Sequence, residues 1–377
     1  MHRQSILFFA LLLSLACCDA DSVRCEEEEE EELLPTPASL KREIASERGA
    51  AVVDAARASI ARILAGEDDR LLVLAGPCSI HDVDASMEYA RILQRLQEEH
   101  GEQLLIVMRT YFEKPRTTLG WKGLINDPLL DSSHNVAHGL RTARTLLRDI
   151  NKAGVACATE FLDPTISLYI SDLISYGSVG ARTCESQTHR EMASGLRMPV
   201  GIKNPTSGDV QEAVDAVVAS SAAHHHVGIN EEGNVVRKRT TGNKGAHVIL
   251  RGGKSGPNYN LTTISTAVDK LEIAKVNSRL VIDCSHGNSF KQHLLQQQVA
   301  QHIAQLVAEG NSNIAGVMLE SFLLAGKQAT PSTVLEVEQL EYGKSITDAC
   351  MDIESTVKVI EQFAEAVKAR RRRIDDK

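Results

Sequence analysis

Short apolar runs alternate with longer amphipathic stretches along most of this chain, from about residue 71 onward. Residues 71–79 are almost wholly apolar, which is typical of a strand buried on both faces. Residues 84–100 place Met87, Ala90 and Leu93 on one stripe, the pattern of an amphipathic helix. The same alternation predicts further strands at 104–112, 155–162, 178–183, 199–203, 279–287 and 314–321.

The sixth strand of this series is harder to place. Within 222–253 the apolar segments HVGI and AHVILRGG are separated by a charged stretch, so we expect inserted β-strands near strand six. Eight strands that alternate with helices predict an α/β fold, a closed (β/α)8 TIM barrel. A doubly wound open sheet is the alternative, but no GxGxxG follows the first strand. Residues 39–70 are predicted to form a helical N-terminal extension and 71–370 the catalytic barrel.

The start of the chain differs in composition from the rest. Residues 1–20 combine a short basic start, an apolar run and small residues, as a secretory signal peptide does. Residues 21–38 contain the unbroken glutamate run from Glu26 to Glu32 and are predicted to be a disordered acidic linker. No later segment has about 18 uninterrupted apolar residues, so we expect no membrane span in the body of the chain.

Charge and cysteine usage narrow the class of function. The 377 residues carry a formal net charge of −9, so a nucleic-acid-binding role is not expected. Eight cysteines occur, and those in the predicted barrel are scattered without CxxC spacing, which is not a disulfide framework. Free thiols suit a reducing compartment, and this conflicts with a secretory signal.

An ionisable or metal-binding side chain stands at the end of every predicted strand. In chain order these residues are Cys78, Arg109, Glu160, Arg182, Lys203, Arg251, His286 and Glu320. The carboxyl ends of barrel strands meet at one mouth, where the active sites of TIM barrels lie. We therefore expect these side chains to surround a single site.

Four residues near this mouth have metal-binding side chains. Cys78, His286 and Glu320 end strands, and Asp348 follows the last strand. A thiolate, an imidazole and two carboxylates suit one borderline divalent metal ion such as manganese, iron, cobalt or zinc. Taken singly, a cysteine or histidine at a strand end is more often a core residue. Their convergence at one mouth favours a metal site.

A second group of residues is cationic and comprises Arg109, Lys114, Arg116, Arg182, Lys203 and Arg251. Cations crowded into one mouth repel one another strongly unless anions bind there. Arginine forks suit phosphate and carboxylate oxygens, so the substrates are expected to carry several negative charges, such as two phosphates and a carboxylate. The alternative is that some of these cations form structural ion pairs with Asp127, Asp131 or Glu185.

Most of these residues lie in long motifs that resemble the type I class of 3-deoxy-D-arabino-heptulosonate 7-phosphate (DAHP) synthase, found in enteric bacteria and fungi. The motifs are GPCSIHD (76–82), MRTYFEKPRTTLGWKGLINDP (108–128), EFLD (160–163), GARTCESQTHRE (180–191), ILRGGKSGPNY (249–259), DCSHGNS (283–289) and YGKSITDAC (342–350). They follow the family's order, and the resemblance covers roughly residues 45–370.

The resemblance implies a metal-dependent, aldol-type transferase. Such an enzyme condenses phosphoenolpyruvate with D-erythrose 4-phosphate and water to give DAHP and phosphate, the first step of the shikimate pathway toward chorismate and the aromatic amino acids. The resemblance also implies one divalent metal ion, a homodimer or homotetramer, and a cytoplasmic location. Residues 1–20 suggest instead a plastid reached through the secretory route, or an incorrectly assigned start of the chain.

The same motifs imply the roles of individual residues. The metal ligands would be Cys78, His286, Glu320 and Asp348. The phosphoenolpyruvate ligands would be Arg109, Lys114, Arg182, Lys203 and Arg251, with Glu160 beside them. The erythrose 4-phosphate site would be the KPRT segment, formed by Lys114, Pro115, Arg116 and Thr117.

The candidate catalytic residues are Lys114, Glu160 and His286. Lys114 is expected to protonate the new alkoxide, with a pKa lowered by its cationic neighbours. Glu160 is expected to steer the attacking water or to balance a cationic carbon.

The chain departs from the family in the pocket that binds an aromatic amino acid in relatives. That pocket usually has a Pro-Gln pair and a serine, where this chain has Ser167, Leu168 and Arg197. An arginine in place of a small hydroxyl would crowd or recharge the pocket. We therefore expect no ordinary inhibition by phenylalanine or tyrosine.

Two other functions compete with this interpretation. The first is 3-deoxy-octulosonate 8-phosphate synthase, another barrel that uses phosphoenolpyruvate, but the segment KPRTTLGWKG favours the shorter aldose. The second is a catalytically dead barrel that acts as a sensor or scaffold. Such a protein would lack a metal ligand or a strand-end cation, and none is missing here.

Overall fold

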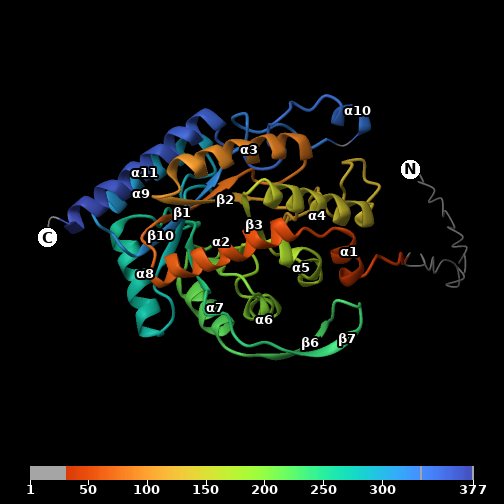
Figure 1. Ribbon diagram of the computed structural model, residues 1–377, viewed down its shortest axis with the longest axis horizontal. Helices are drawn as coiled ribbons and strands as arrows, with labels where there is room; N and C mark the ends of the chain where they lie inside the picture. The colour runs from red at the N-terminus through yellow and green to blue at the C-terminus, as the bar shows by residue number, and fades with distance from the viewer. Residues whose placement is uncertain (1–30, 332, 376–377) are drawn as a thin grey trace, which may run out of the picture. The chain divides into compact units, whose positions relative to one another are not determined.

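Eight parallel strands close into a barrel in the computed structural model of the chain, which describes residues 31–331 and 333–375 (Figure 1). The predicted signal-like segment 1–20 lies outside the described residues, as does the predicted linker up to residue 30. Residues 35–377 form one compact unit, and the helices and strands of the described residues belong to it.

The barrel strands are β1 (Leu71–Gly76), β2 (Leu104–Arg109), β3 (Ala156–Glu160), β4 (Tyr176–Val179), β5 (Val200–Lys203), β8 (His247–Leu250), β9 (Leu280–Asp283) and β10 (Ile314–Glu320). Around the barrel their order is β1-β10-β9-β8-β5-β4-β3-β2. The ring closes between the first and last strands, where Val73 pairs with Val317. The predicted TIM barrel is confirmed, and the open-sheet alternative is wrong.

Helices surround the strands (Figure 1). They are α3 (Val83–His100), α4 (Val136–Lys152), α5 (Pro164–Ile170), α6 (Gln187–Gly195), α7 (Gln211–Ser221), α8 (Leu261–Ile273), α9 (His293–Ala308) and α11 (Ile353–Asp375), with the short η1 (Ser171–Leu173) and α10 (Val334–Val337). The predicted stripe of α3 packs inward, since Ala90 and Leu93 are buried. Asp82 begins this helix by accepting a hydrogen bond from the backbone N–H of Ala85.

The predicted N-terminal extension consists of α1 (Pro37–Glu43) and α2 (Glu47–Ala65). Ile60 and Ile63 of α2 are buried in one cluster with Leu72 and Val281, which lie near the starts of their strands. This helix therefore closes the amino-terminal end of the barrel, opposite the predicted site. Within the described residues, none of the helices combines the length and apolarity that crossing a membrane requires.

A β-hairpin is inserted between α7 and β8, as predicted near strand six. Its strands β6 (His225–Ile229) and β7 (Val235–Arg239) pair antiparallel, with Ile229 opposite Val235. In Figure 1 the hairpin lies away from the barrel strands. Val227 and Val235 are exposed, so the hairpin lacks the buried apolar face that marks the barrel strands.

Candidate active site

The predicted strand-end side chains gather at the carboxyl-terminal mouth of the barrel. Four of them are the last residues of their strands: Arg109, Glu160, Lys203 and Glu320. Because β1, β4, β8 and β9 end earlier than predicted, the other four stand in the loops just beyond: Cys78, Arg182, Arg251 and His286. These loops form the mouth of a TIM barrel, so the shorter strands do not move the residues away from it.

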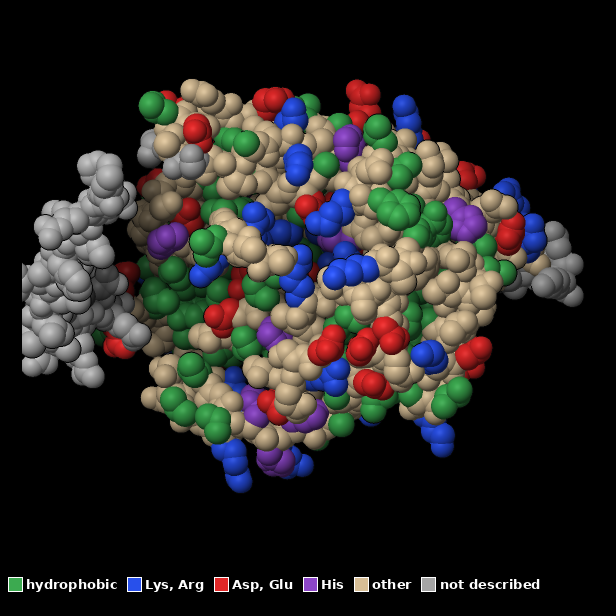
Figure 2. All heavy atoms as spheres, turned by 180° about the vertical axis from the view of Figure 1, so that it is seen from behind, with side chains coloured by type: hydrophobic (Ala, Val, Ile, Leu, Met, Phe, Trp, Pro, Cys, Tyr) green, Lys and Arg blue, Asp and Glu red, His purple; other side chains and the backbone are tan. Residues whose placement is uncertain are grey.

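A cavity of about 270 Å3 occupies this mouth. The nine residues predicted to contact substrates all line it: Arg109, Lys114, Pro115, Arg116, Thr117, Glu160, Arg182, Lys203 and Arg251. His286 and Asp348 line it as well. Lys and Arg side chains gather around a hollow near the middle of the face in Figure 2. The cavity is therefore cationic on one part of its wall and carries metal-binding side chains on another.

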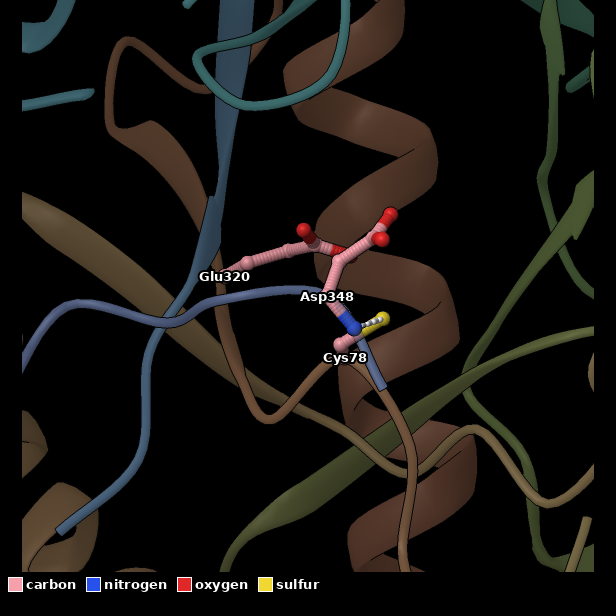
Figure 3. Close-up of side chains that lie close together, drawn as sticks. All are labelled: Cys78, Glu320 and Asp348. Atoms are coloured by element: carbon pink, nitrogen blue, oxygen red, sulfur yellow. Dashed lines mark hydrogen bonds between the residues drawn. The ribbon is translucent and has the colours of Figure 1, made fainter. Parts of the chain in front are cut away.

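Three of the four predicted metal ligands form one tight group. The sulfur of Cys78 and one carboxylate oxygen each of Glu320 and Asp348 lie within 4.8 Å of one another (Figure 3). Cys78 follows β1 and Glu320 ends the neighbouring β10, so the pairing of these strands brings the two together. His286 is not in this group, but its Nε2 lies 3.6 Å from Glu320 Oε1. The donor set fits a borderline divalent metal.

Each ligand in the tight group also contacts a cation. Lys114 Nζ lies 3.0 Å from Cys78 Sγ, and Arg109 Nη2 lies 3.3 Å from Glu320 Oε1. Lys291 Nζ lies 3.2 Å from Asp348 Oδ2. The carboxylates of Glu320 and Asp348 are therefore each paired with a cation, which compensates for their burial, whereas burial raises the pKa of the Cys78 thiol.

The expected lowering of the Lys114 pKa is wrong. Burial favours the neutral amine, but the nearby Cys78, Glu320 and Glu160 outweigh it and raise the pKa of Lys114. The prediction counted the cations of the motif, whereas the closest contact of the ammonium is the Cys78 sulfur. Lys114 therefore holds its proton firmly in this arrangement.

Glu160 forms a buried ion pair with Lys203. Lys203 Nζ lies 3.0 Å from Glu160 Oε2. Burial favours the neutral acid, but Lys203 and Lys114 lower the pKa of Glu160 to about 2. Burial also opposes the charge of Lys203, yet Glu160 raises its pKa. Both groups are thus charged at neutral pH.

The cations of the mouth do not pair with the acidic residues considered as alternatives. Among the described residues, Asp127, Asp131 and Glu185 form no ion pair with any of the six. Arg109 is fully buried, and its Nε and Nη1 donate no hydrogen bond within the described part of the chain. A buried guanidinium with free donors is suited to an anion.

The family model described as the DAHP synthetase I family matches residues 41–361. The chain belongs to this family. The Phe-sensitive phospho-2-dehydro-3-deoxyheptonate aldolase of Escherichia coli (strain K12) is 50% identical over 340 residues, 90% of this chain and 96% of the relative. The putative phospho-2-dehydro-3-deoxyheptonate aldolase of Schizosaccharomyces pombe is 48% identical over 337 residues, 89% of this chain and 91% of the relative.

A solved structure shows the same likeness. Phospho-2-dehydro-3-deoxyheptonate aldolase from Francisella tularensis SCHU S4 matches with a TM-score of 0.88 and 46% sequence identity. The match covers 91% of this chain and 99% of the other. The family resemblance read from the motifs is confirmed.

Three further residues of this DAHP synthetase I family member stand at the site without having been predicted there. The Tyr111 ring lies under Arg109, whose Cζ is 3.9 Å from the ring centroid. Asp283 Oδ2 lies 2.8 Å from His286 Nδ1, a contact that orients the imidazole. Lys291 lines the cavity and pairs with Asp348. Tyr111 and Asp283 lie inside the motifs quoted above, so the sequence could have identified these two residues as candidates for the site.

Proposed function

We propose that this chain is a DAHP synthase, which condenses phosphoenolpyruvate with D-erythrose 4-phosphate and water to give DAHP and phosphate. This reaction is the first step of the shikimate pathway. The observation that carries the proposal is a cation-lined cavity beside a thiol, carboxylate and imidazole group in a chain of the DAHP synthetase I family. The two substrates together bring two phosphates and one carboxylate, the load that such a wall of cations suits.

The cationic residues divide between the two substrates in this proposal. Phosphoenolpyruvate is held by Arg109, Lys114, Arg182, Lys203 and Arg251. Erythrose 4-phosphate is held by Lys114, Pro115, Arg116 and Thr117. The free donors of the buried Arg109 support the first assignment, because an anion there would satisfy them. The exposure of Arg116 and Thr117 at the rim supports the second, because the rim is open to an aldose that arrives from solvent.

One divalent metal ion is proposed as a cofactor. Cys78, His286, Glu320 and Asp348 would hold it, and manganese, iron, cobalt and zinc all suit this donor set. When bound, such an ion supplies a Lewis acid for a substrate carbonyl oxygen. The contact between Asp283 and His286 supports this role, since ligand histidines usually donate their second N–H to a carboxylate or carbonyl.

The proposed proton chemistry follows from the charge states of Lys114 and Glu160. Lys114 carries a raised pKa, so it is a charged donor that gives its proton only to a strong base such as a developing alkoxide. Glu160 is ionised because Lys203 lowers its pKa against burial, so it does not supply a proton at neutral pH. It would instead balance positive charge at C2 of phosphoenolpyruvate and orient the water that adds there.

The test is turnover of defined substrates by the purified protein. Phosphoenolpyruvate consumption should require erythrose 4-phosphate and should stop when a chelator removes metal. Arabinose 5-phosphate in place of erythrose 4-phosphate is the matched control, because a 3-deoxy-octulosonate 8-phosphate synthase would prefer it. If neither aldose is turned over after metal is restored, the result would favour a catalytically dead barrel that acts as a sensor or scaffold. Undiminished turnover after chelation would refute the metal requirement.

Location and assembly complete the proposal. The described cysteines Cys78, Cys157, Cys184, Cys284 and Cys350 are all free and buried, which supports a reducing compartment such as the cytoplasm. A fluorescent fusion of residues 1–45 tests this against targeting to a plastid or the secretory route. A homodimer or homotetramer is proposed from the family, and light scattering of the purified protein measures it.

A further inference from the structure

A buried glutamate joins the loops that follow β2 and β3. Glu113, which precedes Lys114, is only 4% exposed. Its Oε1 accepts a hydrogen bond from the Asp163 backbone N–H at 3.0 Å, and its Oε2 accepts one from Leu162 at 3.3 Å. These two N–H groups lie just beyond Glu160, so Glu113 holds the segment that carries Glu160 against the segment that carries Lys114.

A histidine extends this link to the region beyond β4. His189 in α6 lies with Nε2 2.7 Å from the carbonyl oxygen of Leu162. A carbonyl oxygen only accepts, so Nε2 carries the proton and donates it. The other ring nitrogen, Nδ1, lies 2.8 Å from Ser186 Oγ. The ring is therefore fixed on both sides, in the segment that also carries Arg182.

A third contact closes the connection. Arg182 Nη2 donates to Thr117 Oγ1 at 3.2 Å, back in the loop that contains Glu113. We name this set the loop ring, and it consists of Glu113, Leu162, His189, Ser186, Arg182 and Thr117. The ring joins three successive barrel loops, each of which carries a proposed substrate contact. None of the substrate or metal roles above uses Glu113 or His189.

We propose that Glu113 and His189 are positioning residues that fix Lys114, Glu160 and Arg182 in one mutual geometry around the cavity. The inference rests on the proposed function, because its kinetic effect concerns that reaction. Burial raises the pKa of Glu113 to about 8 despite its two backbone donors, so the side chain is mostly neutral at pH 7 and links the two loops by hydrogen bonds. Fixing these loops affects the rate because a misplacement of about 1 Å at a reacting centre lowers the rate on the order of 100-fold.

The test uses two variants that break the link from opposite ends. Glu113→Gln places an amide N–H2 against a backbone N–H, and His189→Leu removes the donor to Leu162. Each is expected to lower kcat by about 10-fold to 100-fold and to raise KM for phosphoenolpyruvate more than KM for erythrose 4-phosphate, because Glu160 and Arg182 belong to the phosphoenolpyruvate site. The double variant should lose little more than the worse single variant, since either change alone opens the same ring of contacts. His189→Gln keeps an N–H donor and should recover most of the activity.

Trp121, the only tryptophan of the chain, gives a readout that does not depend on activity. It lies in the loop after β2, and its Nε1 donates to the Asp127 carbonyl oxygen at 2.9 Å. Acrylamide quenching of its fluorescence should rise in Glu113→Gln and His189→Leu and stay at the wild-type level in His189→Gln. The exposed Glu185→Gln is the control and should change neither quenching nor kinetics.

The outcomes separate this inference from the proposed function. If the wild-type protein turns over no substrate, the proposed function fails, while Trp121 quenching still tests the loop ring. If the wild-type protein is active, the inference is overturned by unchanged kinetics and quenching in both variants. It is equally overturned if losses in the double variant are additive, or if the variants lose thermal stability with kcat and both KM values intact.

Discussion

The ammonium nitrogen of Lys114 lies 3.0 Å from the sulfur of Cys78 and 3.1 Å from the Cys78 carbonyl oxygen. This contact ties the KPRT segment to the proposed metal group. Pro115 follows at once and restricts the backbone between Lys114 and Arg116. The two cations are therefore held to different tasks, Lys114 at the floor of the cavity and Arg116 at its rim.

This division predicts different kinetic consequences for the two residues. Lys114→Ala should abolish turnover, because it removes both the proposed proton donor and the cation beside Cys78. Arg116→Ala should mainly raise KM for erythrose 4-phosphate, because it removes a phosphate contact outside the reacting centre. Steady-state kinetics with each substrate varied in turn measure both effects. The exposed Lys122→Ala in the same loop is the control, and equal losses in the two test variants would contradict the division.

We predict that metal binding depends on the tight group of Cys78, Glu320 and Asp348. The purified protein, loaded and then desalted, should carry one equivalent of divalent metal by elemental analysis. Cys78→Ser and Asp348→Asn should each lower this content and the turnover together, because each removes a donor from a buried set. Asp131→Asn, at a half-buried residue outside this group, serves as the matched control. Full metal content in both ligand variants would place the metal elsewhere.

Much of this site was predictable because barrel topology converts sequence position into spatial position. Arg109, Glu160, Lys203 and Glu320 end buried apolar strands, so their convergence follows from strand periodicity alone. The alternation of short apolar strands with amphipathic helices was clear in the sequence, because these strands are buried along nearly their whole length. The hairpin β6–β7 was located only approximately, because its exposed valines give no such pattern.

Other features depended on contacts between loops, which periodicity does not describe. The sign of the Lys114 pKa shift depends on the distance to Cys78, a residue from another loop. His286 and Lys291 lie in one loop where both adopt positive φ, 53° and 59°, and this local turn sets which side chains face the cavity. Glu113 and His189 acquire their significance only through backbone groups of Leu162 and Asp163, which no side-chain pattern reveals.

The buried pair of Glu160 and Lys203 predicts a specific dependence of stability on pH. Because the pKa of Glu160 is lowered to about 2, from a usual value of 4.5, its ionised form stabilises the fold above pH 4.5. That contribution should be lost as the pH falls from 4.5 to about 2. Urea unfolding of the wild type should therefore show a steeper loss of stability in this range than the double variant Glu160→Gln/Lys203→Met.

The single variant Glu160→Gln provides a second measurement on the same pair. It leaves the Lys203 ammonium buried without its anion, which costs about 3–5 kcal/mol of unfolding free energy at neutral pH. The double variant should recover much of that loss, because it removes the unpaired charge. A single variant as stable as the wild type would show that solvent or another group compensates Lys203.

Regulation is the last property that the sequence differences predict. Ser167 is buried in α5 with its hydroxyl donated to the Pro164 carbonyl oxygen, and Leu168 lies beside it. Arg197 is exposed just beyond α6, and its charge adds to burial in lowering the pKa of Arg57. A second positive charge there disfavours the ammonium group of a free amino acid. Phenylalanine and tyrosine should therefore leave turnover unchanged, even near their solubility limits.

The assay needs a positive control that responds to an amino acid, and the Phe-sensitive relative from Escherichia coli provides it. Both proteins are titrated with phenylalanine, tyrosine and tryptophan under the same substrate and metal conditions. The relative should lose activity with phenylalanine while this chain does not, because Leu168 and Arg197 replace an amide and a small hydroxyl. Arg197→Ser removes the added charge, so any new sensitivity in that variant would assign the difference to this residue. Strong inhibition of the wild-type chain by phenylalanine or tyrosine would show that its pocket tolerates both replacements.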